Sequence, residues 1–416
     1  MFHQLFQNPP TIERHQAAPL LEERSSYLAH CADQGRTKSS LRLIAQHLLV
    51  FVDYLPLTTV REIDIEQLHT AADRWVHRQP LPPHVTNYYY GRMRFISDAR
   101  QWLHFMGRLR QAEVPQRSYT PMIQAYVDYM AQECGLSLHT IRSRCWVLEQ
   151  FLSRFWQQQR PFDQIGIGDI DAAIARKGNQ DGYARTSMQA YTTVLRAFFR
   201  YAAHQGWCAS GLAATIRSPR LFADASLPTS PSWEDVQQLL TTTDGEQPKD
   251  IRDRAIILLF AVYGMRVGEV RGLRLDDLDW EQERISMTRP KSRRRQVYPL
   301  SHTVGEAILH YLRAVRPRAP YREVFLRLKA PFGPLSSGVL YDVVSDRLRA
   351  LALPLSHYGP HALRHACATR LLTQGLSMKE IGDYLGHRKA ETTRVYAKVD
   401  LGGLRQVANF ALGDLR

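Results

Sequence analysis

The sequence predicts a mainly α-helical chain of several domains, with one small antiparallel β element. Its 416 residues are more than a domain with a single hydrophobic core usually contains, which indicates two to four domains. Apolar residues recur at helical spacing through most of the chain, and three helical segments repeat in the same order about 100 residues apart. Only Arg284–Arg289 and Arg294–Leu300 alternate in the way typical of paired strands.

The composition favours a polyanionic partner. The chain holds 54 Lys and Arg against 40 Asp and Glu, a net charge of +14, although a merely solvated basic surface would give the same count. Its five cysteines are scattered and form no C-x-x-C pair, which indicates reduced thiols. The N-terminus lacks a signal-peptide pattern, and the longest apolar run, Ala255–Gly264, is too short to span a bilayer. We therefore expect a cytoplasmic, nucleoid-associated protein with no membrane partner.

The first block, about residues 19–110, is predicted to be helical. Ser39–Leu55 places apolar residues at helical intervals, and Ile63–Arg78 follows as a second helix before a proline-rich breaker. Asn87–Leu109 is predicted as a third helix that is rich in aromatic residues.

The second block repeats this arrangement. His139–Trp156 is a basic amphipathic segment like Ser39–Leu55, and Ile165–Lys177 and Thr186–Trp207 follow in the positions of the second and third helices. A constant offset over three segments indicates an internal duplication of a small helical domain. The alternative is that any two amphipathic three-helix units resemble one another.

A Pro- and Ser-rich segment, Ser226–Asp235, separates these blocks from the rest and ends in a predicted helix start, with Ser232 as N-cap and Asp235 at the third helical position. We therefore expect domains at 1–114, 115–225 and 226–416. In the last domain, the predicted helices flank the two strands and lie at Ile251–Tyr263, Val267–Leu273, Val304–Val315, Leu340–Leu351, His361–Gln374, Met378–Leu385 and Glu391–Lys398.

The last domain also contains the groups needed to break a phosphodiester without a metal. Arginines suit the non-bridging oxygens, because their planar fork matches two oxygens and keeps its charge. Histidine or lysine can move protons, and a tyrosine hydroxyl can act as nucleophile once the site activates it. Each residue alone has a commoner structural explanation, but together they form a candidate site: Arg266, Lys291, His361, Arg364, His387 and Tyr396.

The order of these residues resembles the catalytic domain of the tyrosine recombinase (phage integrase) family, including the Xer recombinases. The chain has "YGMRVGEVRGL" where the family has T/Y-G-x-R-x-x-E-x-x-x-L, and "HALRH" for H-x-L-R-H. The ending "LGHRKAETTRVYAKV" is similar to the family's L-G-H segment with a threonine ahead of the tyrosine. Lys291 matches the lysine of the β2–β3 turn, although Pro290 replaces the usual glycine. The resemblance covers about residues 226–410.

The resemblance implies a role for each position. Tyr396 would attack the scissile phosphate and form a 3′-phosphotyrosine, and Arg266 and Arg364 would clamp the non-bridging oxygens. His387 would donate to the phosphoryl group, and His361 would assist proton transfer. Lys291 would act as the general acid that protonates the leaving oxygen. Glu269 would support the site without touching DNA. No cofactor or metal is implied, and the sequence has no H-E-x-x-H cluster.

The resemblance also implies a fold of two tandem small helical (SAM-like) DNA-binding domains followed by an α+β catalytic domain. The second block would be the core-binding domain, and the first block an additional copy that grips more DNA or contacts a protein. Candidate DNA-contacting residues are Arg142, Arg144, Arg185, Arg196, Arg293 and Arg294.

Double-stranded DNA at specific sites is the expected partner. We expect a homo-tetramer on two DNA sites, with the C-terminal tail docked on a neighbouring subunit. The sequence does not say whether a second recombinase or a DNA-bending protein takes part. The expected function is site-specific recombination for a mobile element. The alternatives are relaxation of DNA by a type IB topoisomerase and a regulator that only binds DNA.

Overall fold

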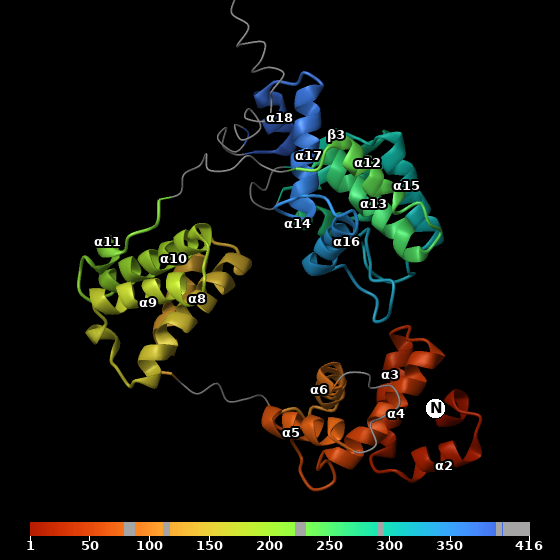
Figure 1. Ribbon diagram of the computed structural model, residues 1–416. Helices are drawn as coiled ribbons and strands as arrows, with labels where there is room; N and C mark the ends of the chain where they lie inside the picture. Colours follow the sequence, from red (N-terminus) through yellow and green to blue (C-terminus); the bar gives the residue numbers. More distant parts are fainter. Residues whose placement is uncertain (79–87, 111–116, 221–229, 290–294, 388–392, 394–416) are drawn as a thin grey trace, which may run out of the picture. The chain divides into compact units, whose positions relative to one another are not determined.

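The computed structural model describes residues 1–78, 88–110, 117–220, 230–289, 295–387 and 393. Helices make up most of these segments, and one three-stranded sheet lies in the C-terminal part (Figure 1). Residues 112–226 form a compact unit, which we call the middle block. The segments before and after it, the N-terminal and C-terminal blocks, have hydrophobic cores of their own.

The N-terminal block confirms the three predicted helices to within a few residues. They are α4 (Lys38–Tyr54), α5 (Ile65–Val76) and α6 (Tyr88–Phe105). Their apolar faces meet with that of α3 (Leu21–Asp33) in one core around the fully buried Trp102. Three helices that the sequence analysis did not predict individually precede α4: α3 itself, α1 (Phe2–Leu5) and α2 (Pro9–Ala17).

The middle block has the same helical order. Its predicted helices are confirmed as α8 (Leu138–Gln157), α9 (Ile167–Asn179) and α10 (Arg185–His204). α7 (Thr120–Gln132), which was not predicted, packs on α8 and adds Tyr126 to the core. Two short elements complete the block, η1 (Phe162–Gln164) and α11 (Leu212–Thr215).

Several residues of the N-terminal block have counterparts in the middle block with the same structural role. Thr37 caps the start of α4 through its side-chain oxygen, and Ser137 caps α8 in the same way. Leu48 and Leu148 are both buried, as are Phe51 and Phe151. The offset of these pairs agrees with the spacing that suggested a duplication.

The C-terminal block begins with the predicted cap. The Ser232 hydroxyl accepts from the Asp235 amide at 3.1 Å, while the Asp235 carboxylate accepts from the Ser232 amide at 2.8 Å. The helices are α12 (Trp233–Thr241), α13 (Pro248–Tyr263), α14 (Val267–Arg271), α15 (His302–Ala314), α16 (Ser337–Ala350), α17 (Pro360–Thr373) and α18 (Met378–Leu385), with η2 (Leu275–Asp277) after α14.

The sheet lies between α14 and α15 in the sequence. Its strands β1 (Leu278–Asp279), β2 (Arg284–Thr288) and β3 (Arg295–Pro299) are antiparallel, in the order β1-β2-β3. Ile285 pairs with Tyr298, and both side chains are buried in the same core. The predicted strand pair is confirmed, whereas the two-residue β1 was not predicted.

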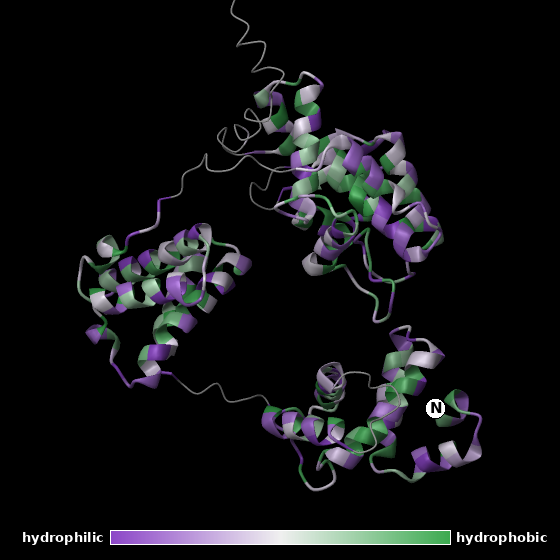
Figure 2. Cartoon of the chain, in the orientation of Figure 1, coloured by the Kyte–Doolittle hydropathy of each residue, from purple (hydrophilic) through white to green (hydrophobic). Residues whose placement is uncertain are grey.

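α13 forms the centre of the C-terminal block. Most of its residues are buried, and it packs against α12, α15, α16 and α17 (Figures 1 and 2). A helix that is apolar on nearly all sides must be covered on all sides, which explains its central place. Its C-terminal end, Tyr263 and the following Gly264, is also buried, and the candidate site lies beside it.

Two further observations bear on the class of protein. All five cysteines are free thiols in the structure. Within the described segments, no helix is long and apolar enough to cross a membrane.

Candidate active site

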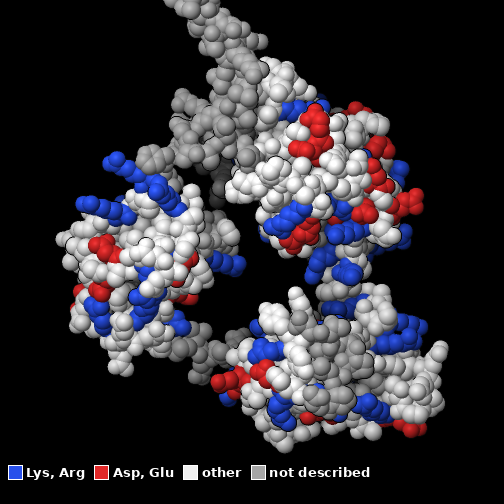
Figure 3. Space-filling model, viewed as in Figure 1, with Lys and Arg blue, Asp and Glu red and all other residues white. Residues whose placement is uncertain are grey.

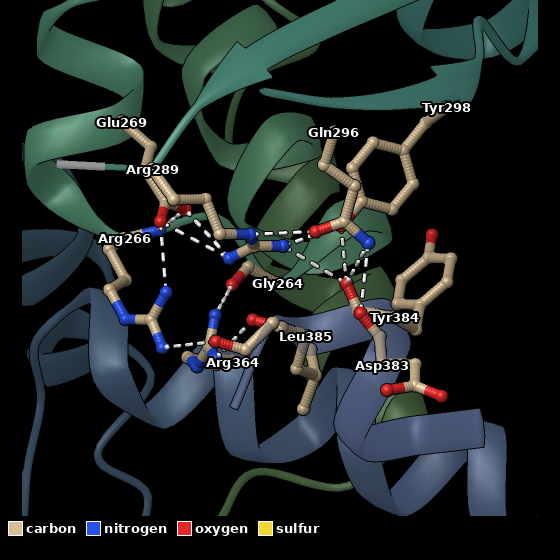
Figure 4. Close-up of polar contacts among 11 residues, drawn as sticks. Gly264, Arg266, Glu269, Arg289, Gln296, Tyr298, Arg364, Asp383, Tyr384 and Leu385 are labelled. Carbon is tan, nitrogen blue, oxygen red and sulfur yellow. Dashed lines mark hydrogen bonds and ion pairs between the residues drawn. The ribbon is translucent and has the colours of Figure 1, made fainter. Parts of the chain in front are cut away.

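Three helix ends and a strand end meet next to the C-terminus of α13. Gly264 ends α13 with a φ of +57°, in the left-handed region that favours glycine. A Cβ atom there would lie 2.5 Å from the Leu385 side chain at the end of α18. The absent side chain thus lets α13 and α18 approach, and it brings together the residues drawn in Figure 4.

Arg364 lies at the bottom of this site. It projects from α17 and is only 2% exposed. Its guanidinium donates to the main-chain carbonyl of Gly264 and, at 2.7 Å, to that of Leu385 (Figure 4). Two carbonyls from different helices therefore fix the position of a buried positive charge.

Arg266 lies closer to the surface, at the start of α14. Its Nη1 donates to Glu269 at 2.9 Å and its Nη2 to the Gly386 carbonyl at 3.3 Å. Its side chain remains 36% exposed, whereas that of Glu269 is fully buried. Glu269 also accepts from the Arg266 main-chain amide at 2.8 Å. The carboxylate therefore binds both the main chain and the guanidinium of Arg266.

A third arginine that the sequence analysis did not assign to the site completes this cluster. Arg289 follows β2 and is 3% exposed. Its Nη1 donates to both oxygens of Glu269, at 3.2 and 3.4 Å, and its Nε donates to Gln296 at 2.7 Å (Figure 4). Two guanidinium groups, those of Arg266 and Arg289, therefore share the Glu269 carboxylate, while the Arg364 guanidinium is bound by main-chain carbonyls.

His387 follows α18 at the edge of the cluster. Its main-chain amide donates to the Gly382 carbonyl at 2.8 Å, and its Nδ1 lies 2.8 Å from the Thr393 hydroxyl. Burial, reinforced by the positive charges of Arg364 and Arg266, lowers the pKa of His387 to about 4. The imidazole is therefore neutral at neutral pH. Thr393 was part of the motif, but the sequence did not reveal this contact.

His361 lies on the first turn of α17, on the exposed side. Desolvation, followed by the charges of Arg364 and Arg266, lowers the pKa of His361. Its ring centroid is 4.7 Å from that of His365, whose pKa burial lowers to about 4. Both rings thus favour the neutral form next to the arginine cluster.

Four of the predicted residues lie outside the described segments. They are Lys291, Arg293, Arg294 and the predicted nucleophile Tyr396. Of the six predicted catalytic residues, the structure therefore places Arg266, His361, Arg364 and His387.

The predicted DNA-contacting arginines of the middle block differ in their surroundings. Arg142 on α8 and Arg185 on α10 are exposed. Arg144 lies against the Met130 sulfur, and Arg196 donates to the Ile216 carbonyl at 2.7 Å and to Ser218 at 2.9 Å. Arg196 thus holds the segment after α11 onto α10. In the view of Figure 3, basic and acidic side chains are interspersed on the surface.

The cluster of Arg266, Arg364 and neutral His387 is suited to bind a phosphate group. Arginine forks donate two hydrogen bonds to its oxygens, and a neutral imidazole can donate one more. Among the described residues, no group of three or more His, Cys, Asp or Glu side chains could hold a metal ion.

Comparison with known proteins identifies the class. Residues 232–401 match the phage integrase family, and residues 123–206 match the phage integrase N-terminal SAM-like domain. A relative from Sinorhizobium fredii, "Putative integrase/recombinase y4rA", is 38% identical over 288 residues, 69% of this chain and 69% of the relative. Tyrosine recombinase XerD of Listeria innocua is 29% identical over 296 residues, 69% of this chain and 96% of that protein.

Solved structures agree on the fold. XerH site-specific recombinase bound to a palindromic difH substrate matches with a TM-score of 0.53 at 18% identity, over 85% of this chain and 98% of that chain. A lambda integrase dimer bound to a COC′ core site (residues 75–356) matches with a TM-score of 0.52 at 17% identity, over 66% of this chain and 94% of the other.

The chain therefore belongs to the phage integrase family of tyrosine recombinases. It is a site-specific DNA recombinase, an enzyme that binds DNA, cleaves its strands and rejoins them.

Proposed function

We propose that this recombinase serves a mobile element and cleaves DNA through a 3′-phosphotyrosine on Tyr396, without metal or ATP. The observation that carries this proposal is that Arg266 and Arg364 bind the carbonyls of Gly386 and Leu385, which directly precede His387, so that both positive charges act on the His387 ring. The relative named as an integrase/recombinase supports the mobile-element role.

In the proposed reaction, the Tyr396 oxygen attacks the scissile phosphorus in line, and the bond to the 5′ oxygen breaks. Arg266 and Arg364 bind the non-bridging oxygens, where negative charge grows in the transition state. Lys291 gives a proton to the departing 5′ oxygen, and His361 assists removal of the tyrosine proton. A 5′ hydroxyl of another strand later attacks the phosphotyrosine. The number of ester bonds is thus unchanged, and the exchange needs no external energy.

His387 acts in this proposal as a neutral hydrogen-bond donor. If the Thr393 hydroxyl donates to its Nδ1, the ring proton resides on Nε2 and can be given to a phosphate oxygen. The lowered pKa of His387 supports this form at neutral pH.

We also propose the domain organisation given above, with residues 115–225 as the core-binding domain and 1–114 as its duplicate. Arg142 and Arg185 are exposed and would contact DNA phosphates. Arg144 and Arg196 have partners within the middle block and would contribute less.

Exchange of two duplexes needs four cleavage events, so we propose a tetramer on two DNA sites with each tail docked on its neighbour. The tail after residue 400 contains spaced apolar residues, Leu401, Leu404, Val407 and Phe410. The C-terminal block offers a hollow of about 500 Å³ lined in part by Trp233, Leu258 and Leu371, which would suit such a segment. We also propose that the protein is cytoplasmic and associates with the nucleoid, and that a second recombinase or an accessory DNA-bending protein can join the assembly.

The test is recovery of covalent protein–DNA adducts from cells that express the wild type, Tyr396→Phe or Tyr321→Phe. Tyr321 is an exposed tyrosine of the C-terminal block and serves as the matched control. We expect adducts at one short sequence from the wild type and Tyr321→Phe, and none from Tyr396→Phe. Dispersed adducts would favour a topoisomerase. Adducts that persist in Tyr396→Phe would refute the proposed nucleophile, and none from any variant would favour a regulator that only binds DNA.

A further inference from the structure

Arg289 contacts four residues of the candidate site through its guanidinium: Glu269, Gln296, Tyr298 and Tyr384. Besides Glu269 and Gln296, its guanidinium donates to the Tyr298 hydroxyl and, at 3.0 Å, to the main-chain carbonyl of Tyr384 (Figure 4). These partners lie on α14, β3 and α18, so one buried side chain joins the sheet to both helices that flank the phosphate-binding cluster.

The contact with Glu269 has an electrostatic consequence. A carboxylate that faced Arg266 alone would neutralise it and compete with a phosphate for its hydrogen-bond donors. Because Arg289 shares the same oxygens, the group of two arginines and one carboxylate keeps a net positive charge. This leaves Arg266 oriented by Glu269 and still able to bind an anion.

The opposite end of the guanidinium positions the residues before His387. The Tyr384 carbonyl accepts from Arg289, from Gln296 at 3.4 Å and from the Tyr298 hydroxyl. Burial raises the pKa of Tyr298 to about 12, so its hydroxyl retains the proton that it donates. A Cβ atom on Gly386 would lie 2.3 Å from the Arg289 Nε. The main chain leading to His387 therefore lies directly against this arginine.

We propose that Arg289 is a positioning residue for DNA cleavage: it shares Glu269 with Arg266 to keep Arg266 available for the scissile phosphate, and it fixes the end of α18 from which His387 extends. The same side chain fixes the end of β2, two residues before Lys291. Arg289 itself does not touch DNA. This inference rests on the proposed function.

The experiment uses the full-length protein and a duplex with the site mapped by the adduct sequencing, nicked so that cleavage is trapped. Single-turnover formation of the covalent complex at saturating DNA gives the cleavage rate, and fluorescence anisotropy gives the DNA affinity. For Arg289→Met we expect a cleavage rate lowered at least tenfold, with the Kd for DNA changed less than about threefold. Arg289→Lys retains the positive charge but lacks the planar guanidinium group. Its cleavage rate should therefore lie between those of the wild type and Arg289→Met.

Arg347→Met is the matched control, because the Arg347 side chain is also mostly buried, at 14% exposure, and has several partners, which lie near the start of α13 and not near its end. We expect it to lower the thermal stability but not the cleavage rate per folded molecule. The background Glu269→Gln tests the mechanism, since without the carboxylate charge Arg289 has less to offset. The rate loss from Arg289→Met should therefore be several-fold smaller in that background.

Wild-type cleavage separates the two proposals. If the wild type does not form the covalent complex, the proposed function fails and this inference with it. If the wild type cleaves and Arg289→Met cleaves at the same rate, only the inference fails. A rate loss that is equal with and without Glu269→Gln, or one that matches the Arg347→Met control, would likewise overturn it.

Discussion

At Gly386 the main chain adopts a φ of +64°, next to the Arg289 guanidinium. Gly386→Ala would strain the main chain by about 1–2 kcal/mol and also collide with Arg289. We expect loss of stability beyond that amount and at least a tenfold slower cleavage. Gly375→Ala is the control, because Gly375 also has a positive φ but nothing within 4 Å of the added Cβ. For Gly375→Ala, chemical denaturation should show only the loss of stability due to main-chain strain, and the cleavage rate should stay at the wild-type value. Equal effects of Gly375→Ala and Gly386→Ala would contradict the contact between Gly386 and Arg289.

His387 provides a pH-dependent test at the same scale. Its pKa is about 4 in the folded chain, against about 6.5 when unfolded. Between these values the unfolded state binds a proton that the folded state does not, so its contribution to stability is complete above pH 6.5 and is lost as the pH falls towards 4. Residue-resolved histidine hydrogen exchange should give midpoints near 4 for His387 and His365 in buffer, and near 6.5 in denaturant. A folded-state midpoint near 6.5 would contradict the burial.

Single residues differ in how far the sequence reveals them. Arg266 and Arg364 could be predicted because they lie in motifs of fixed spacing, and the structure places both at one site. Arg289 could not, because an arginine at the end of an alternating strand is usually solvated. Its burial depends on Glu269, Tyr298 and Tyr384, which come from distant parts of the chain.

At the scale of elements, a partly buried ionic network joins α13 and α16. Arg347 donates to Asp250 at 2.7 Å and to Asp253 at 3.1 Å, and Asp253 is fully buried. Arg347→Met would remove one of the two ion pairs of the buried Asp253 and keep the other, with Arg252. We therefore expect the free energy of unfolding to fall by about 2–4 kcal/mol. Chemical denaturation followed by tryptophan fluorescence would measure it.

Arg322→Met is the control for that network, because its pair with Asp276 is exposed on both sides. We expect a loss below about 1 kcal/mol. If the two substitutions cost the same, the partly buried network would not stabilise the packing of α16 on α13.

Most long elements followed from apolar periodicity, as with α4, α8 and α13. The elements that were not predicted individually are mainly short, apart from α3 and α7. β1 has two residues, too few to show alternation, and exists because Leu278 and Asp279 pair with β2. The longer α7 begins with Thr120 and Pro121 at its first turn, a start signal that the sequence analysis did not use.

At the scale of the whole molecule, the N-terminal block poses the main functional question. Several of its basic side chains pair with acidic residues of the same block, as Arg92 does with Asp73 and Arg110 with Glu62. Such pairing offsets part of the positive charge of this block, so we expect its contribution to phosphate binding to be small. We expect removal of residues 1–111 to change the slope of log Kd against log salt for DNA by less than about one unit. A decrease of about three units or more would show that the block binds several phosphates.

The most direct test of the account is to identify the residue that carries the DNA. Covalent complexes formed on the mapped site would be digested with nuclease and trypsin, and the peptides analysed by mass spectrometry. We predict a nucleotide attached to the Tyr396 oxygen in the peptide Val395–Lys398, with a free 5′ hydroxyl on the other DNA fragment and no adduct from Tyr396→Phe. A nucleotide on any other residue, or a 5′ phosphate on the released fragment, would contradict the account.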